Sequence, residues 1–325
     1  MACDYMATPN SSEGPGAISP EEAFKILGDE TRLQILQRLG EADEPLAFSE
    51  LYKRIENDDT ANFNYHLDKL VGHFVRETDE GYTLHRAGSR IVEAILSGVV
   101  TDDPELERAP VDFPCPLCGG SMEVSYREEN LVGHCSTCQG TRGSSNAPPS
   151  WPTEATDDIV GQVRLPPAGL HGRTPTELIQ TAEIWSAVRG LAIARGVCHN
   201  CSAPVKEFVH VCDDHDTSDG HCEACDQQFR VTIYRNCTNC IVEWDAPVGQ
   251  HLLANTEVMG FMINHGIDPL APGGFHLAAL EETVHSTDPF EAQFTFTVDG
   301  DALSLIMDQN LSVDDVTRHD ASTDC

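Results

Sequence analysis

Five Cys-x-x-Cys pairs constrain the fold of this chain more than any other feature of its sequence. Such a turn brings two thiolates to one side of a tight loop, where they bind a tetrahedral metal ion such as Zn²⁺. Redox-active thiols also use this spacing. The first 20 residues have neither a basic start nor an apolar segment, so we expect no signal peptide and favour zinc over disulfides. The pairs are Cys115/Cys118, Cys135/Cys138, Cys198/Cys201, Cys222/Cys225 and Cys237/Cys240.

The first two pairs predict a zinc ribbon over residues 113–140. Sixteen residues separate them, enough for a strand over Met122–Tyr126, a turn, and a returning strand over Leu131–His134. Both cysteine turns then meet at one end of the hairpin. Four thiolates make a closed, structural zinc site. The predicted ligands are Cys115, Cys118, Cys135 and Cys138.

A second zinc-binding module is predicted over residues 198–242. Its strands, Val205–Val211 and Phe229–Tyr234, form an antiparallel hairpin with cysteines at both ends. This arrangement predicts two sites, one formed by Cys198, Cys201, Cys237 and Cys240, the other by Cys212, His215, Cys222 and Cys225. The simpler alternative is a single zinc held by Cys198, Cys201, Cys222 and Cys225. We therefore expect three zinc ions in the whole chain, and at least two.

Residues 19–100 have the pattern of a winged helix-turn-helix domain. Capping residues and apolar periodicity predict four successive helices, the fourth with Thr60 as its N-cap. Two β-prone runs then flank Asp79-Glu80-Gly81 and predict a hairpin. A last helix ends at Gly98.

The fourth helix is the predicted DNA-reading helix. Phe63, Leu67, Leu70 and Val71 form one apolar stripe, which leaves amide, phenol and ammonium groups on the opposite face. A plain surface helix would also carry polar residues there, and Asp68 is unfavourable beside phosphates. The candidate DNA contacts are Lys53, Arg54, Thr60, Asn62, Asn64, Tyr65, His66, Lys69, Arg76 and Arg86, the last two on the wing strands.

The run FKILGDETRLQILQRL resembles the opening of arsenic-repressor-type (ArsR-like) regulators, and FNYHLDKLVGHFV with GYTLHRAG resembles their recognition helix and wing. The resemblance covers residues 20–98 and implies a homodimer on a two-fold DNA site. The joining of such a domain to cysteine-rich segments resembles regulators of salt-loving archaea. The third helix carries Ser49-Glu50-Leu51 in place of a Cys-x-Cys pair, so the resemblance does not imply metal sensing there.

The charge is strongly negative, with 20 Lys+Arg against 53 Asp+Glu and a net charge of −33. Scattered acidity over foldable segments indicates a halophilic surface, where multimolar salt screens repulsion. The alternatives are an ordinary acidic protein or disordered acidic segments. Residues 20–100 hold nine basic and sixteen acidic residues. This balance permits DNA binding without arguing for it.

The remaining segments complete an α+β chain: the winged helix, the zinc-ribbon β-hairpins and a small α/β C-terminal region. We predict a helix over 174–197, opened by a capping box at Thr174-Pro175-Thr176-Glu177. A small α+β region covers 243–310, with a helix over 250–265 and strands over 291–298 and 302–307. The other segments are a disordered tail (1–18), linkers (101–112 and 141–173) and an acidic tail (311–325).

These patterns predict a cytoplasmic, sequence-specific regulator of transcription that binds double-stranded DNA. One alternative is a zinc-ribbon adaptor that binds the transcription machinery. Two others are a metal or redox sensor and a thiol-redox enzyme. No nucleophile elbow, phosphate-binding glycine loop or His-Glu-x-x-His pattern is present, so we expect no enzyme. No apolar run reaches the ~20 residues that a membrane-spanning helix needs.

Overall fold

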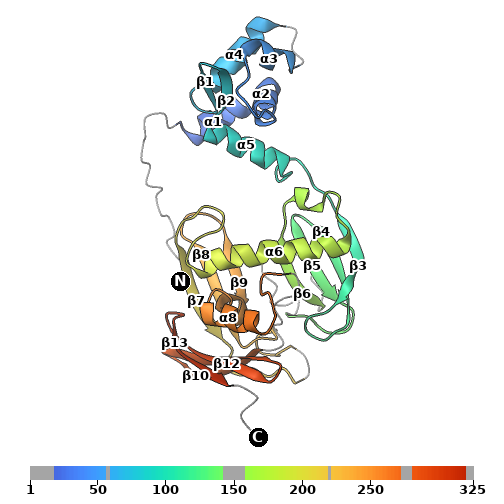
Figure 1. Cartoon of the computed structure of the whole chain (residues 1–325), viewed down its shortest axis with the longest axis vertical. Helices are drawn as coiled ribbons and strands as arrows, with labels where there is room; N and C mark the ends of the chain where they lie inside the picture. Colours follow the sequence, from blue (N-terminus) through green and yellow to red (C-terminus); the bar gives the residue numbers. More distant parts are fainter. Residues whose placement is uncertain (1–17, 56–58, 142–157, 219–220, 272–279, 320–325) are drawn as a thin grey trace. The chain divides into compact units, whose positions relative to one another are not determined.

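The computed structural model describes residues 18–55, 59–141, 158–218, 221–271 and 280–319. They divide into an N-terminal unit up to Asp102 and a C-terminal unit from Asp103 onward. Helices and four small antiparallel sheets make the chain a mixed α+β protein, as predicted (Figure 1). No helix in these ranges is both long and apolar enough to cross a membrane.

The N-terminal unit follows the predicted order of four helices, a hairpin and a final helix. Asp29 caps α2 by accepting a hydrogen bond from the Arg32 amide. Helix α4 is capped by Asp59, whose carboxylate accepts from two amides, so the prediction of Thr60 as the cap was one residue late. The elements are α1 (Pro20–Leu27), α2 (Glu30–Gly40), α3 (Phe48–Lys53), α4 (Thr60–Leu70), β1 (Val75–Thr78), β2 (Gly81–Leu84) and α5 (Arg86–Leu96).

The β1–β2 turn requires a glycine at position 81. Its φ is +138°, and a Cβ there would lie 2.4 Å from the carbonyl oxygen of Leu46. The close approach arises because Leu46 and Tyr82 pair through two backbone hydrogen bonds. Thr78 pairs with Gly81, so the turn has two residues between the strands instead of the three predicted.

The core of the N-terminal unit takes buried side chains from α2, α3, α4, β1 and α5, while half-buried side chains of α1 and β2 pack at its margin. Phe63, Leu67 and Leu70 of α4 are buried there, as the apolar stripe predicts, whereas Val71 ends the helix as its C-cap. The N-terminal unit therefore has a hydrophobic core of its own. The buried residues are Ile35, Leu36, Leu39, Leu46, Leu51, Ile55, Phe63, Leu67, Leu70, Phe74, Val75 and Val92.

The C-terminal unit begins with a four-stranded antiparallel sheet in the order β3-β4-β5-β6. The two inner strands are those predicted for the first ribbon. The two outer strands lie in segments predicted as linkers, a prediction that is wrong for 106–112 and for 159–164. The strands are β3 (Leu106–Pro114), β4 (Ser121–Arg127), β5 (Asn130–Cys135) and β6 (Ile159–Arg164), and a 3₁₀ turn η2 (Pro167–Leu170) follows.

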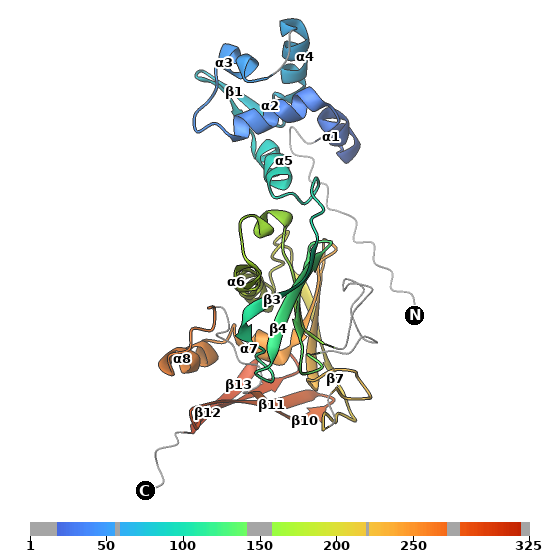
Figure 2. The same cartoon turned by 90° about the vertical axis from the view of Figure 1, so that its right-hand side faces the viewer.

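Helix α6 (Pro175–Ala194) lies across this sheet (Figures 1 and 2). It begins with the predicted capping box, in which Thr174 and Glu177 satisfy each other's backbone amides. Its first turns bury Leu178, Ile179 and Ala182 in the same cluster as the inward side chains of β4 and β5. Helix α6 therefore closes one face of the first sheet.

Two further antiparallel sheets complete the C-terminal unit. The first, in the order β7-β8-β9, contains the predicted hairpin of the second cysteine module. The second, in the order β10-β11-β12-β13, includes the two strands predicted about Asp299-Gly300. The strands are β7 (Val205–Val211), β8 (Val231–Cys237), β9 (Glu243–Pro247), β10 (Leu280–Thr287), β11 (Phe290–Val298), β12 (Asp301–Asp308) and β13 (Val313–His319).

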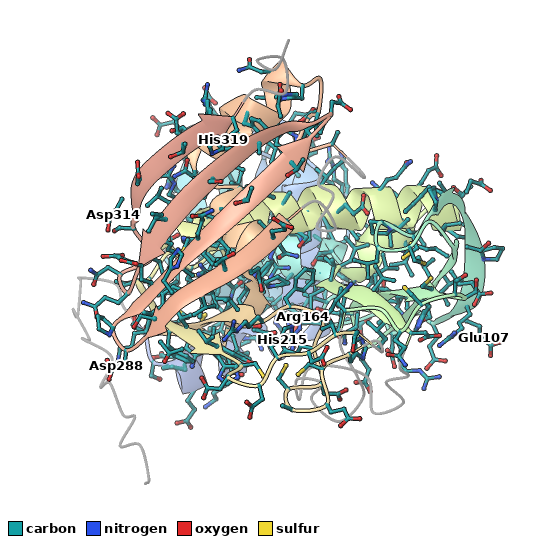
Figure 3. All side chains as sticks on the ribbon, turned by 90° about the horizontal axis from the view of Figure 1, so that it is seen from below. Glu107, Arg164, His215, Asp288, Asp314 and His319 are labelled. Carbon is teal, nitrogen blue, oxygen red and sulfur yellow. The ribbon has the colours of Figure 1, made fainter. Side chains whose placement is uncertain are left out.

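Two details of this region differ from the predictions. The helix predicted over 250–265 is two helices, α7 (Val248–Leu252) and α8 (Thr256–Asn264), because Asn255 caps a new helix. Residues 313–319, predicted as part of an acidic tail, form the edge strand β13. Figure 3 looks onto this sheet, with Asp288 in the β10–β11 turn at one end and His319 at the other.

The largest core of the molecule lies between the last two sheets and the short helices. Val231 and Ile233 of β8 pack there with Phe294 and Phe296 of β11 and with α8. The second cysteine module is therefore built into the C-terminal fold and shares its core. The predicted tail at 1–17 lies outside the described residues.

Candidate metal centres

Three groups of four side chains bring metal-binding atoms together in the C-terminal unit. Within each group, all ligand atoms lie within 4.8 Å of one another. We name them clusters 1, 2 and 3. They are Cys115, Cys118, Cys135 and Cys138; Cys198, Cys201, Cys237 and Cys240; and Cys212, His215, Cys222 and Cys225.

The sulfur spacing in clusters 1 and 2 suits one tetrahedral zinc ion in each. In cluster 1, the Sγ atoms of Cys115 and Cys138 are 3.8 Å apart, and those of Cys118 and Cys135 are 3.5 Å apart. In cluster 2, the corresponding distances are 3.6 Å and 3.4 Å. Thiolates about 2.3 Å from a tetrahedral zinc stand ~3.8 Å from one another, so both clusters have nearly the required size.

Cluster 3 pairs three thiols with one imidazole. Cys212 and Cys222 have Sγ atoms 3.9 Å apart, and the Cys225 Sγ lies 3.4 Å from His215 Nδ1. The other ring nitrogen of His215 lies 3.3 Å from the Gln228 carbonyl oxygen, which can only accept. The proton is therefore assigned to Nε2, and the Nδ1 lone pair faces the cysteines, as a metal ligand requires.

The imidazole of His215 has the protonation state that metal binding needs. Burial lowers its pKa, and the nearby positive charge of Arg230 lowers it further. These effects outweigh the hydrogen bond to Gln228 and the charge of Asp216, which both act in the opposite direction. A neutral imidazole is the form that coordinates zinc.

Three of the Cys-x-x-Cys turns share one backbone geometry. In each, the residue after the second cysteine has a left-handed backbone and donates its amide to the carbonyl of the first cysteine. This residue is Gly119 at φ +75°, Ser202 at +62° and Asp226 at +52°. In each, the first cysteine's own amide donates five residues ahead, to Gly120, Ala203 or Gln227. This repeated turn brings both thiols of a pair to one side.

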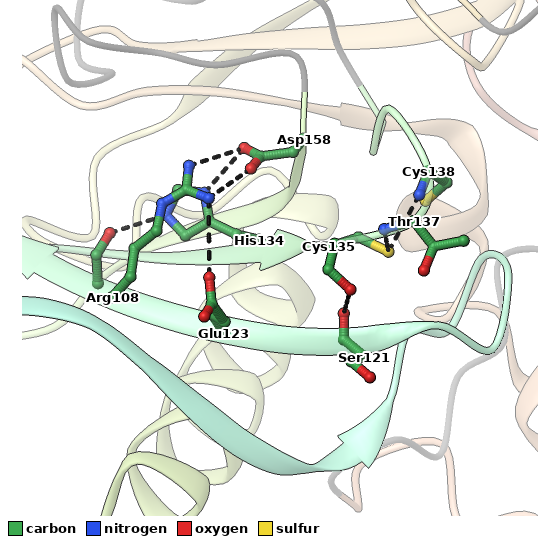
Figure 4. Close-up of polar contacts among 10 residues, drawn as sticks. Arg108, Ser121, Glu123, His134, Cys135, Thr137, Cys138 and Asp158 are labelled. Atoms are coloured by element: carbon green, nitrogen blue, oxygen red, sulfur yellow. Dashed lines mark hydrogen bonds and ion pairs between the residues drawn. The ribbon is translucent and has the colours of Figure 1, made fainter.

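Backbone amides also point at sulfur atoms in the Cys-x-x-Cys turns, including the Cys135–Cys138 turn. The amides of Thr137 and Cys138 each lie 3.3 Å from the Cys135 Sγ (Figure 4). Burial alone would raise the pKa of Cys135, but these amides outweigh it and lower the pKa to about 7. In cluster 2, the Ala203 amide is the main cause that lowers the pKa of Cys201 to about 6. One thiol of each of these two clusters is therefore readily deprotonated to the form that binds zinc, whereas burial raises the pKa of Cys138 and of Cys240.

The ligand grouping agrees with the two-site interpretation of residues 198–242. Cys222 and Cys225 lie with Cys212 and His215, at the opposite end of the β7–β8 hairpin from Cys198. The alternative single site, which combines Cys198 and Cys201 with Cys222 and Cys225, does not match this geometry.

His134, adjacent to cluster 1, belongs to a different network (Figure 4). Its Nδ1 lies 3.0 Å from an Asp158 carboxylate oxygen, and its Nε2 lies 2.8 Å from the Ser125 hydroxyl. Arg108 donates to the same carboxylate at 2.6 and 3.2 Å. The sequence does not reveal this network, because Asp158 lies in a segment predicted as linker. Serine, histidine and aspartate follow the order of a hydrolytic triad, yet the guanidinium of Arg108 neutralises the aspartate.

The predicted DNA contacts are mostly exposed, with two differences from the predictions. His66 is buried, and its Nδ1 lies 3.3 Å from an Asp29 carboxylate oxygen, so it is not available to a duplex. Arg86 begins helix α5 instead of lying on a wing strand, and its guanidinium lies 3.4 Å from Glu93. The exposed candidates are Lys53, Arg54, Thr60, Asn62, Asn64, Tyr65, Lys69, Arg76 and Arg86.

Fold and site together define an α+β protein with a small helical unit and a larger unit that carries three cysteine-rich clusters. Residues 112–313 match a family model described as a domain of unknown function, DUF7351. The chain belongs to this family. Residues 20–95 match a second model of the same kind, DUF7347. None of the curated proteins and none of the solved structures compared with the chain matches it.

Proposed function

We propose that this protein is a transcription regulator that binds double-stranded DNA through α4 and holds three structural zinc ions in its C-terminal unit. The observation that carries the DNA-binding proposal is the orientation of α4. Its Phe63, Leu67 and Leu70 are buried, while Asn62, Tyr65 and Lys69 are exposed on the opposite face. Amide and cationic groups on the outer face of a helix are those that read base edges in a major groove.

The neighbouring elements support the same proposal. Helix α3 precedes α4 and the hairpin β1–β2 follows it, which is the element order of a winged helix-turn-helix domain. Arg76 is exposed on β1 and would reach the DNA backbone from the wing. The resemblance to ArsR-like regulators adds a homodimer on a two-fold site to the proposal.

The charge around α4 predicts how binding depends on salt. The ammonium of Lys69 lies 5.5 Å from the Tyr65 ring centre, so the two present a joint cationic and aromatic surface. Asp59 caps the same helix, and Asp68 accepts a hydrogen bond from Asn64. Few phosphates are therefore neutralised, and affinity should fall less steeply with salt than for a basic DNA-binding protein. We expect DNA binding to persist in concentrated KCl, as the strongly acidic composition implies.

The zinc proposal assigns a structural role to all three clusters. Each offers four protein ligands and leaves no position for a substrate, which is typical of structural zinc. Zinc in such sites contributes directly to the free energy of folding. The first sheet packs against α6 and the second module shares a core with the last sheet, so zinc would add to this packing.

The DNA-binding proposal is tested by mapping bound genomic fragments and measuring their affinity in molar KCl. Replacing Asn62, Tyr65 and Lys69 together by alanine is expected to remove specific binding, a loss of about 3 kcal/mol or more. The matched control replaces Lys25 and Arg90, exposed cations on α1 and α5, and should bind normally. Unchanged affinity in the triple variant, with its fold intact by circular dichroism, would refute the assignment of α4.

A second candidate function is an adaptor that binds protein through the C-terminal unit. Helix α6 favours it, since Ile184, Trp185 and Val188 are 46 %, 43 % and 57 % exposed. Apolar exposure of this kind marks protein interfaces when it is contiguous. Replacing these three residues by serine would impair an adaptor and leave DNA affinity unchanged.

A further inference from the structure

The C-terminal unit contains a cavity of about 430 Å³ that none of the three clusters fills. Its walls come from α6, from the β5–β6 part of the first sheet, and from the segment that leads from cluster 2 into β9. A volume of this size lies in the ~300–1,000 Å³ range of small-molecule sites. The cavity is therefore large enough for an organic ligand.

One end of the cavity holds a guanidinium without a carboxylate partner. Arg189 donates to the carbonyl of Arg164 at 3.1 Å and to His199 Nε2, and its guanidinium lies 5.7 Å from the Trp185 ring centre. Among the described residues, no carboxylate lies within ion-pair distance of Arg189. Burial lowers the pKa of Arg189, and the nearby charges of Cys198 and Glu129 raise it only in part, so a bound anion would further stabilise this half-buried guanidinium.

His199 provides a second donor at the same end. Because arginine can only donate, Nε2 of His199 accepts, and the ring proton is assigned to Nδ1. Nδ1 is buried and has no hydrogen-bond partner among the described residues. A buried donor without a partner costs about 1–3 kcal/mol, a penalty that a bound acceptor would remove.

Apolar side chains form much of the remaining wall, which also includes the carboxylates of Glu183, Glu243 and Asp245. Trp244 of β9 meets the His199 ring edge-on, with ring centres 5.6 Å apart. Ile179 of α6, Leu131 of β5 and Leu253 after α7 also line the cavity. A largely apolar wall that includes a few charged and polar groups is usual in small-ligand sites.

We propose that this cavity binds a small aromatic acid, whose anionic group pairs with Arg189 and accepts a hydrogen bond from His199 Nδ1. The aromatic body lies against Trp244. The inference goes beyond the DNA-binding and zinc proposals, and its test involves neither DNA nor metal exchange. His199 lies inside the Cys198–Cys201 turn, so a ligand here would also touch the chain segment that forms cluster 2.

The test uses two dyes that share an apolar body and differ in charge. 8-Anilinonaphthalene-1-sulfonate is an aromatic acid, and N-phenyl-1-naphthylamine is its neutral counterpart. The zinc-loaded, full-length protein is titrated with each dye, with fluorescence as the readout. We expect saturable binding of the acid at one site. Replacing Arg189 by Gln should raise its Kd roughly tenfold or more, because a charge-assisted hydrogen bond is lost. The Kd of the neutral dye should change less than about twofold.

Two further variants make the test decisive. Arg173→Gln removes an exposed cation at the start of α6, outside the cavity lining, and should leave both dyes unaffected. Gly190→Met fills the cavity from α6, where a Cβ would lie 3.8 Å from Trp244, and should abolish binding of both. Zinc content and the melting temperature verify the fold of each variant.

The proposal is overturned if the wild-type protein binds no acid dye. It is also overturned if Gly190→Met leaves binding intact, or if Arg189→Gln weakens both dyes equally. Should Arg189→Gln fail to fold, Arg189→Lys replaces it. That variant keeps the charge and loses the planar fork, so it should weaken the acid dye by a smaller factor and leave the neutral dye unchanged.

Discussion

Asp158 shows how one side chain can connect segments that are far apart in sequence. Its carboxylate binds Arg108 on β3 and His134 on β5, and it precedes β6 directly. Burial lowers the pKa of His134 despite this hydrogen bond, so the imidazole is held neutral in the network. The network joins both edges of the first sheet to its centre.

Replacing Asp158 by Asn tests this connection. The amide cannot form the ion pair with Arg108, so the free energy of unfolding of the C-terminal unit should fall by about 1–3 kcal/mol. Denaturant unfolding of the zinc-loaded protein measures it. Glu105→Gln, which breaks an exposed ion pair with Arg127 at 3.2 Å, should cost less than ~0.5 kcal/mol. Equal effects would show that this half-buried network stabilises the unit no more than an exposed ion pair does.

Glu282 should make stability depend on pH. Burial raises its pKa from 4.5 to about 7, although the amides of Arg230 and Val231 donate to it. The folded state therefore holds this proton more tightly than the unfolded chain does. The resulting stability is complete below about pH 4.5 and is lost as the pH rises through about 7.

Glu282→Gln should remove this dependence, because an amide imitates the neutral acid. The unfolding free energy of the wild type, relative to the variant, should fall by about 1–3 kcal/mol between about pH 5 and about pH 8.5. Comparing the two proteins at each pH cancels any change in zinc affinity. Parallel curves would contradict the assignment.

At the scale of elements, the β7–β8 hairpin keeps clusters 2 and 3 apart, although their ligands are interleaved in the sequence. The ends of an antiparallel hairpin are fixed by its register, here Val205 opposite Cys237 and Val211 opposite Val231. Cluster 2 therefore lies at one end and cluster 3 at the other. If the clusters are independent, the number of zinc ions that each cysteine variant retains can be predicted.

Native mass spectrometry of cysteine variants tests that prediction. The wild type should carry three zinc ions, and Cys198→Ser or Cys222→Ser should each carry two. The double variant should carry one, because it damages two clusters. If both residues served the same ion, the double variant would carry as many as each single variant. Ser202→Ala, which leaves every ligand in place, is the control and should keep all three.

The edge strands of the first sheet, β3 and β6, depend on their neighbouring strands for stability. Strand β3 contains two prolines and has register shifts against β4, so its sequence alone has little strand character. Strand β6 has a glycine and a glutamine, yet its Ile159 is buried beside Gly140. Pairing with β4 and β5 stabilises both strands, and no local signal predicts such pairing.

On the scale of the whole molecule, all three clusters lie in the C-terminal unit, and the N-terminal unit has a core without cysteine. Clusters 1 and 3 are also linked, since the His221 amide donates to Gln139 at 3.1 Å and the Gln228 amide donates to Thr141 at 3.1 Å. Loss of metal from one should therefore weaken the other.

Removing zinc should unfold the two units unequally. A strong chelator is expected to lower the stability of the C-terminal unit by several kcal/mol while the helices of residues 18–96 persist. Limited proteolysis followed by mass spectrometry measures this, with cleavage appearing first beyond Asp103. Zinc-dependent protection of the N-terminal helices would contradict it. Added zinc should restore protection if the thiols have stayed reduced.

Local chemistry in the sequence was enough to predict most helices, the inner strands and the grouping of twelve ligand residues. Capping residues, apolar periodicity and Cys-x-x-Cys spacing act over a few residues, so they can be recognised from the sequence alone. Asp158 with Arg108, Arg189 with His199, the edge strands and the burial of His66 were decided by tertiary structure. Each depends on which distant surfaces meet, and that choice follows from the combined packing of several elements instead of any one segment.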